Sequence, residues 1–85
     1  MSTEKEVGFV VHYFSHLNVA GIDVTKESIQ VGDVLHFKGH TTDFEQTITS
    51  MQIEHKEVAK AKKGDSIGMQ VSDKVRVHDK VFKVI

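Results

Sequence analysis

The histidines are the side chains of this sequence with the widest chemical range. There are six among 85 residues, and two pairs share one spacing, His12 with His16 and His36 with His40. On a helix this spacing places two imidazoles on one face, where they can bind zinc. Both pairs, however, begin in predicted strands and end in turns, so helical geometry does not apply. We therefore favour surface or turn histidines with hydrogen-bonded rings, and we predict no metal and no cofactor. A histidine cluster from adjacent strands, binding zinc or another borderline metal, is the weaker alternative.

A second group of residues is rich in positive charge. Between His55 and Lys63, four lysines accompany one acidic residue, Glu57. Lysines contact the phosphates of nucleic acids, so a local patch of this kind indicates RNA binding. The other interpretation is a solvated loop that keeps one end of the domain soluble. The candidate contacts, to RNA or to another partner, are Lys38, His40, His55, Lys56, Lys60, Lys62 and Lys63.

Aromatic side chains could add to such an RNA contact. Tyr13, Phe14 and Phe37 would stack on bases if their rings were exposed. In small barrels, however, aromatic side chains more often belong to the core, which is the interpretation that we favour.

Catalytic arrangements are harder to find. Carboxylates are plentiful, but neither Glu54 with Glu57 nor Asp73 with Asp79 has a spacing typical of a general acid and base. Such a pair needs a partly dry pocket to separate its two pKa values, and a small barrel is normally filled by its own side chains. The sequence also lacks the G-x-x-x-x-G-K-[ST] loop that holds nucleotide phosphates. We therefore expect no catalytic residue, no enzyme and no GTP binding.

Composition limits the size and class of the fold. A chain of 85 residues makes one small domain with one core. Eleven basic and twelve acidic residues give a net charge of −1, so nucleic-acid binding would need a local patch. The sequence has no cysteine and no long apolar run. These features favour a cytoplasmic protein with no disulfide and no membrane contact.

The elements that position all these residues are strands. Apolar residues recur with period two in short segments separated by polar turns. The apolar residues change phase between residues 44–48 and residues 51–53, so we expect a bulge or bend near Thr49-Ser50. Such bends occur at the corners of barrels. We predict an all-β fold, a small closed Greek-key-like β-barrel of six to seven strands over residues 6–85, preceded by a disordered N-terminus at residues 1–5.

Glycines punctuate this pattern. The pairs Gly32-Asp33 and Gly64-Asp65 predict two turns, because glycine supplies a positive φ and aspartate accepts hydrogen bonds from nearby amides. Gly68 is also expected to have a structural role, because a glycine there allows another backbone segment to approach closely. Residues 56–63 are too short for an independent helix, so we expect a loop or a single turn there.

Taken together, these segments resemble a known family. Residues 31–35 have the sequence Val-Gly-Asp-Val-Leu, and residues 48–68 join a bent strand to a second Gly-Asp turn. In order and spacing they are similar to the second domain of translational GTPases such as elongation factor Tu, over residues 6–85. The resemblance implies a stand-alone elongation-factor-like protein with a barrel of the translation-protein type. In that family the barrel contacts ribosomal RNA, the acceptor end of tRNA or the neighbouring GTPase domain.

The resemblance leaves the partner open. A related barrel is an accessory domain of certain collagenase-like peptidases that act in RNA modification, so a protein partner is equally compatible with it. The leading hypothesis is a non-enzymatic binding module that contacts the ribosome, tRNA or another structured RNA. The first alternative is a protein-interaction domain that docks on a larger enzyme, and the histidine-based metal binder is the weaker one.

Overall fold

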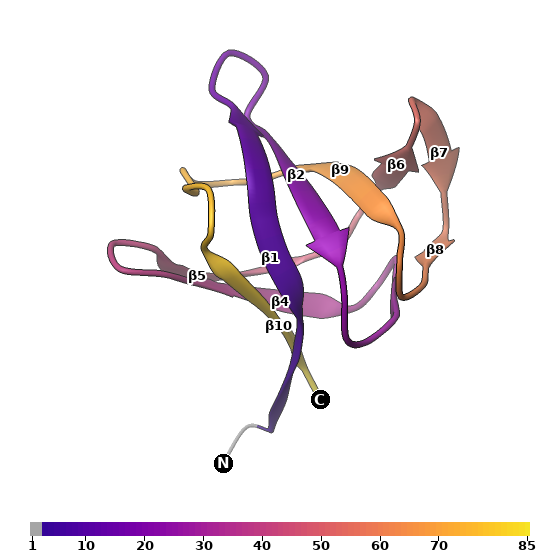
Figure 1. The fold of residues 1–85 in the computed structure, drawn as a ribbon, viewed down its shortest axis with the longest axis horizontal. Coiled ribbons are helices and arrows are strands. Elements are labelled where there is room, and N and C mark those ends of the chain that lie inside the picture. The colour runs from indigo at the N-terminus through magenta and orange to yellow at the C-terminus, as the bar shows by residue number, and fades with distance from the viewer. Residues whose placement is uncertain (1–2) are drawn as a thin grey trace.

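The computed structural model describes residues 3–85 and builds them from ten strands (Figure 1). The strands are short and rich in β-branched and aromatic residues, as strand propensity requires. No helix occurs within residues 3–85, so this part of the chain contains no helical membrane span. The strands are β1 (Glu4–Phe14), β2 (Val19–Val24), β3 (Ile29–Gln30), β4 (Val34–Lys38), β5 (Asp43–Thr47), β6 (Met51–Ile53), β7 (Lys56–Val58), β8 (Lys60–Ala61), β9 (Ser66–Gln70) and β10 (Lys80–Val84).

The strands form an open sheet and not a closed barrel. Eight of them pair in the order β5-β4-β10-β1-β2-β9-β6-β7, and β3 pairs with β8 in a separate two-stranded ribbon. The two edges of the large sheet, β5 and β7, do not pair with each other. The all-β prediction is therefore confirmed, whereas the prediction of a closed Greek-key-like barrel of six to seven strands is wrong.

Two backbone hydrogen bonds fix the break between β5 and β6. The amide of Ile48 donates to the carbonyl of Asp33 at 2.8 Å, and the carbonyl of Ile48 accepts from the amide of Gly32 at 2.9 Å. These bonds hold Ile48 against the turn before β4 and satisfy both of its backbone polar groups. Ile48 and Met51 are both buried on either side of the break, which confirms the predicted change of phase.

The core lies on the inner face of the curved sheet. In β2, alternate residues Ala20, Ile22 and Val24 are buried, and the residues between them face outward. Phe37 of β4 is fully buried and stacks on Phe44 of β5, with 5.0 Å between ring centroids. Because its ring is enclosed, Phe37 belongs to the core and is not a base-stacking platform.

The two Gly-Asp turns have nearly the same geometry. Gly32 and Gly64 have φ angles of 101° and 97°, a conformation that glycine adopts without steric cost. Asp33 and Asp65 each accept a hydrogen bond from the backbone amide three residues earlier, at 3.0 and 2.9 Å. Each pair thus closes one tight turn that leads into a strand of the large sheet.

Three local features differ from what the sequence predicted. β1 begins at Glu4, so residues 4 and 5 belong to a strand and not to a disordered N-terminus; residues 1–2 of that segment lie outside the described residues. Residues 56–63 contain β7 and β8 in place of a loop or single turn, because these strands pair with β6 and β3. Gly68 lies inside β9, where an added Cβ would meet only Val19 Cγ1, at 3.7 Å, so no backbone atom of another segment lies within 4 Å of that Cβ position.

Candidate functional site

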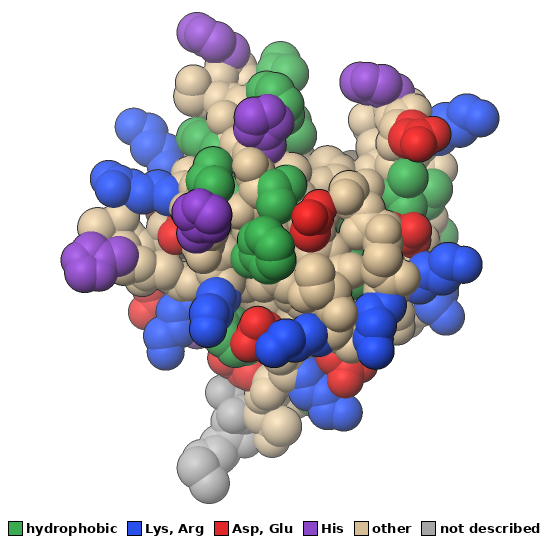
Figure 2. Space-filling view, in the orientation of Figure 1, with side chains coloured by type: hydrophobic (Ala, Val, Ile, Leu, Met, Phe, Trp, Pro, Cys, Tyr) green, Lys and Arg blue, Asp and Glu red, His purple; other side chains and the backbone are tan. Residues whose placement is uncertain are grey.

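An apolar groove of about 490 Å³ lies on the outer face of the sheet, where β1, β2, β9 and β6 are neighbours. Figure 2 shows hydrophobic side chains gathered over β1 and β2 on the face in view, with histidine side chains beside them and lysine and arginine side chains to the left and below. The apolar walls include Val11, Phe14, Leu17 and Val19. Concave pockets lined mostly by apolar side chains with a few polar groups are the usual form of binding sites.

Two glycines form the floor of the groove. Gly21 of β2 and Gly68 of β9 are direct cross-strand partners, so neither strand has a side chain at this point. Packing accounts for Gly21, because a Cβ there would lie 3.1 Å from the Cβ of His12 on β1. Packing does not account for Gly68, whose added Cβ would make one ordinary contact. The second glycine therefore keeps open a space that this domain does not need for its own fold.

The hairpin between β1 and β2 presents apolar side chains at one end of the groove. Leu17 is 64% exposed and Phe14 is 47% exposed. The amide of Leu17 donates to the carbonyl of Phe14 at 3.1 Å, and the Tyr13 hydroxyl donates to Asn18 Oδ1 at 3.3 Å. Asn18 has a φ of 52°, which asparagine adopts more readily than most residues. The turn therefore holds Leu17 in solvent instead of folding it onto the core.

Another part of the rim is the strained turn between β6 and β7. Glu54 and His55 have φ angles of 51° and 66°, and both line the groove. A left-handed conformation costs a non-glycine residue roughly 1–2 kcal/mol, and two-residue turns of this kind usually contain Asn-Gly. Strain of this type is concentrated at functional sites. Ser66 Oγ donates to Asp23 Oδ1 at 2.7 Å and adds a further polar group to the rim.

The lysines predicted to contact RNA are exposed but do not line the groove. Lys56 lies in β7, Lys60 in β8, and Lys62 and Lys63 follow β8. His55 is the one predicted contact that lies on the groove's rim.

The other two predicted contacts lie far from these lysines. Lys38 ends β4 and His40 lies in the turn that follows, at the opposite end of the long axis from β7 and β8 (Figure 1). The structure therefore does not bring Lys38 and His40 to the lysine-rich segment.

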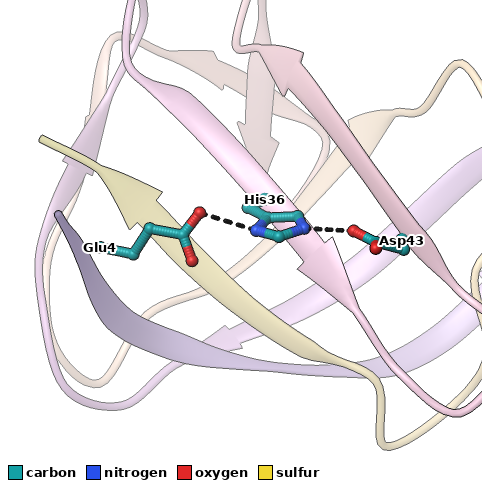
Figure 3. Close-up of polar contacts among 3 residues, drawn as sticks. All are labelled: Glu4, His36 and Asp43. Atoms are coloured by element: carbon teal, nitrogen blue, oxygen red, sulfur yellow. Dashed lines mark hydrogen bonds and ion pairs between the residues drawn. The ribbon is translucent and has the colours of Figure 1, made fainter. Parts of the chain in front are cut away.

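Neither of the histidine pairs read from the sequence lies within one element. His12 lies in β1 and His16 in the turn after it, while His36 lies in β4 and His40 in the next turn. The ring of His36 instead lies between two carboxylates (Figure 3). Its Nδ1 is 2.7 Å from Glu4 Oε2, and its Nε2 is 2.5 Å from Asp43 Oδ1.

These contacts change the acidity of both partners. The hydrogen bond to Asp43 is the largest cause that raises the pKa of His36 above 6.5, with Glu4 adding to it and burial opposing it. The same hydrogen bond from His36 lowers the pKa of Asp43 below 3.8. The cluster therefore favours a charged imidazolium between two carboxylates.

The groove is the feature that sequence reasoning missed. Leu17, Val19, Gly21 and Asp23 alternate with the core positions of β2, so the pattern places them on the outer face. The groove could have been predicted from this face, because it is outward-facing and yet carries two apolar residues, Leu17 and Val19, and a glycine, Gly21. Only the pairing of Gly21 with Gly68 shows that this face is hollow.

Comparisons with known proteins connect this fold to peptidases. No protein-family model matches the chain. Over 78 residues it is 37% identical to an uncharacterized protease of Methanocaldococcus jannaschii and 35% identical to a collagenase of Porphyromonas gingivalis. Both alignments cover 91% of this chain but only 19% and 22% of the relatives. The chain thus spans about a fifth of the length of the curated relatives it matches.

Two solved structures have the same fold. Both show the C-terminal domain of a Geobacillus thermoleovorans protein assigned to the U32 peptidases, one of them as a selenomethionine variant. The TM-scores are 0.86 and 0.85 at 20% and 19% identity. The first match covers 93% of this chain and 91% of that domain, and the second covers 91% and 96%.

These findings correct two predictions. The resemblance to the second domain of translational GTPases, and with it the elongation-factor-like identity, is wrong, because the sequence relatives are a protease and collagenases. The expectation of no enzyme is contradicted by the same findings, because the relatives are named a protease and collagenases. Over nearly its whole length the chain is instead similar to parts of these proteases, and its fold is that of a U32 peptidase C-terminal domain.

Proposed function

We propose that the chain is an accessory domain of a U32-type peptidase and docks, through the apolar groove, on the larger catalytic part of that enzyme. The observation that carries the proposal is an exposed apolar groove on a domain whose fold is that of one part of a longer peptidase-type protein. About four fifths of the length of each curated relative lies outside the region that matches this chain. We place the docking partner of the groove in that remainder.

The groove has the composition of a docking surface. Its centre is apolar and its rim carries Asp23, Glu54 and His55, which is the arrangement of core and rim in protein interfaces. Leu17 and Phe14 project from one hairpin and form the natural anchors, since a few buried apolar side chains dominate the energy of most interfaces.

The contribution of one anchor can be estimated. Complete burial of a leucine side chain stabilises by roughly 1.5–3 kcal/mol. Leu17 has 64% of its surface exposed, so its burial against a partner leaves roughly 1–2 kcal/mol to gain. That is about a tenfold change in affinity. Aspartate at this position would lose this contribution and would also place a charge against apolar surface.

The experiment is a titration of the chain into the catalytic part of a U32-type peptidase from the same cell, with any segment that matches this chain removed. Calorimetry compares Leu17→Asp with Ile85→Asp. The two side chains are matched in exposure, 64% and 63%, but Ile85 lies at the far end of the molecule from the β1–β2 hairpin (Figure 1). We expect Leu17→Asp to weaken binding at least tenfold and Ile85→Asp to leave it unchanged.

Two outcomes contradict the proposal. Equal loss in both variants would show that the effect is not local to the groove. Absence of binding to the enzyme, together with salt-dependent binding of tRNA that disappears when Lys56, Lys60, Lys62 and Lys63 become glutamate, would favour RNA as the partner. Ribonuclease treatment of the samples keeps the two results separate.

A further inference from the structure

Glu4, His36 and Glu45 bring three metal-ligating side chains together, independently of the groove. One possible ligand atom from each residue lies within 4.8 Å of the other two. Across residues 3–85 this is the one group of three or more such side chains with this proximity. Its members come from three different strands, β1, β4 and β5. The spacing of these residues in the sequence therefore does not predict the group.

The register of the sheet fixes their relative positions. His36 lies directly opposite Glu45 in the pairing of β4 with β5, so the two side chains share one face of the sheet. Glu4, at the start of β1, reaches the imidazole across β10, which lies between β1 and β4 (Figure 3). The ring of Phe82 on β10 lies 6.5 Å from the imidazole and gives it an apolar neighbour. The ligand atoms are therefore held by the sheet and not by a mobile loop.

The two nitrogens of His36 are oriented differently. Nδ1 faces Glu4, one of the three grouped residues, at 2.7 Å. Nε2 faces Asp43, which is not one of the three, at 2.5 Å. Histidines that bind metals usually donate their second ring nitrogen to a carboxylate, which fixes the tautomer and the ring orientation. Asp43 occupies that position here.

The cluster also has more negative than positive charge. Three carboxylates surround one imidazole, and the ion pairs that lysines form in the described part of the chain involve carboxylates elsewhere. Lys38 lies opposite Asp43 and acts on that residue. Glu4 and Glu45 thus present oxygen donors whose charge a divalent cation can balance.

We propose that Glu4, His36 and Glu45 bind one zinc ion, with Asp43 orienting the histidine and water in the fourth position. Zinc binds Nδ1 of His36 and one oxygen of each glutamate at its usual distances of about 2.0–2.2 Å. Binding displaces the proton from Nδ1 to solvent, while the proton on Nε2 stays in the bond to Asp43. Glu45 is exposed, so its side chain is free to turn toward the ion.

Such an ion would act as a cross-link within the sheet. It joins the first residues of β1 to β4 and to the edge strand β5, three strands away in the sheet order. Metal binding would therefore protect the N-terminal end of β1 and the β5 edge from opening.

The experiment uses untagged protein that has been treated with a chelator and then titrated with zinc chloride near pH 7. Calorimetry should give one zinc ion per chain, and cobalt in place of zinc should give the visible absorption of a tetrahedral site. We expect His36→Gln and Glu45→Gln each to weaken zinc binding at least tenfold, and Asp43→Asn to weaken it about 10- to 100-fold. His40→Gln changes an exposed histidine outside the group and should leave binding unchanged.

Glu45→Gln keeps the test valid if the histidine variant is unstable, because Glu45 is exposed and is not part of the hydrophobic core. Far-ultraviolet circular dichroism checks that each variant is folded. The proposal is overturned if the chain takes up no zinc, or if folded His36→Gln and Glu45→Gln proteins bind it as tightly as the unchanged chain. Loss of binding in His40→Gln would equally show that the zinc lies elsewhere.

Discussion

Replacing Gly68 by valine separates the role of the groove from the stability of the fold. Gly68 lies within β9, its φ is not positive, and an added Cβ would meet only Val19 Cγ1, at an ordinary 3.7 Å. Glycine weakens a strand by roughly 0.5–1 kcal/mol relative to alanine, and valine is among the best strand formers. Gly68→Val should therefore raise the free energy of unfolding by about 0.5–1 kcal/mol.

The same change should impair docking. The valine methyl groups would rise from the floor of the groove into the space that a partner side chain fills. Losing one buried apolar anchor costs roughly 1.5–3 kcal/mol, which weakens binding about 10- to 100-fold. Gly68→Ala adds one carbon and should give an intermediate loss.

Two measurements check this reasoning. Thermal unfolding of the variant should show a melting temperature about 2–8 °C higher, since 1 kcal/mol corresponds to about 4–8 °C in a domain of this size. Calorimetry with the catalytic part of the peptidase should show the weaker binding. A lower melting temperature would refute the view that Gly68 is structurally dispensable, and undiminished binding would refute the groove as the docking surface.

Three further changes probe the rest of the structure. Gly8→Ala should destabilise the fold by about 1–3 kcal/mol or more, because its Cβ would lie 1.8 Å from the carbonyl oxygen of Asp23; urea unfolding measures this. His55→Gly should raise the free energy of unfolding by about 1 kcal/mol, because it relieves a φ of 66°. In chelator-treated protein, the pKa of His36 is raised, so its stabilising effect is complete below pH 6.5 and is lost as the pH rises through the folded-state pKa. The pKa of Asp43 is lowered, so its effect is present above pH 3.8 and is lost on acidification.

Each of these predictions has an outcome that would contradict it. A Gly8→Ala protein as stable as the unchanged chain would mean that β1 and β2 can separate at no cost. A His55→Gly protein of lower stability would mean that the imidazole makes contacts that outweigh the strain. For the pH dependence, His36→Gln serves as the control, and an unchanged profile in that variant would remove the histidine as its source.

Much of the fold follows from local patterns in the sequence. The turns at Gly32 and Gly64 are predictable because a positive φ and a capping aspartate act within a few residues. The bend after β5 is predictable because Ile48 and Met51 must both be buried, which one flat strand does not allow. Closure of the sheet is not predictable in this way, since it depends on whether edge strands far apart in the sequence pair with each other.

The candidate sites depended on these long-range pairings even more strongly. The sequence determined that the chain is all-β, where its main turns lie and where the apolar residues change phase, because alternation and turn chemistry are local. Tertiary structure alone decided that Gly21 and Gly68 meet to form an open groove, and that Glu4 lies beside His36, 32 residues away in the chain. Both arrangements are set by strand order and register, and many registers are compatible with the same local pattern. The physical reason is that burial of the hydrophobic residues selects one of these registers. The chosen register then determines which outward-facing residues lie next to each other.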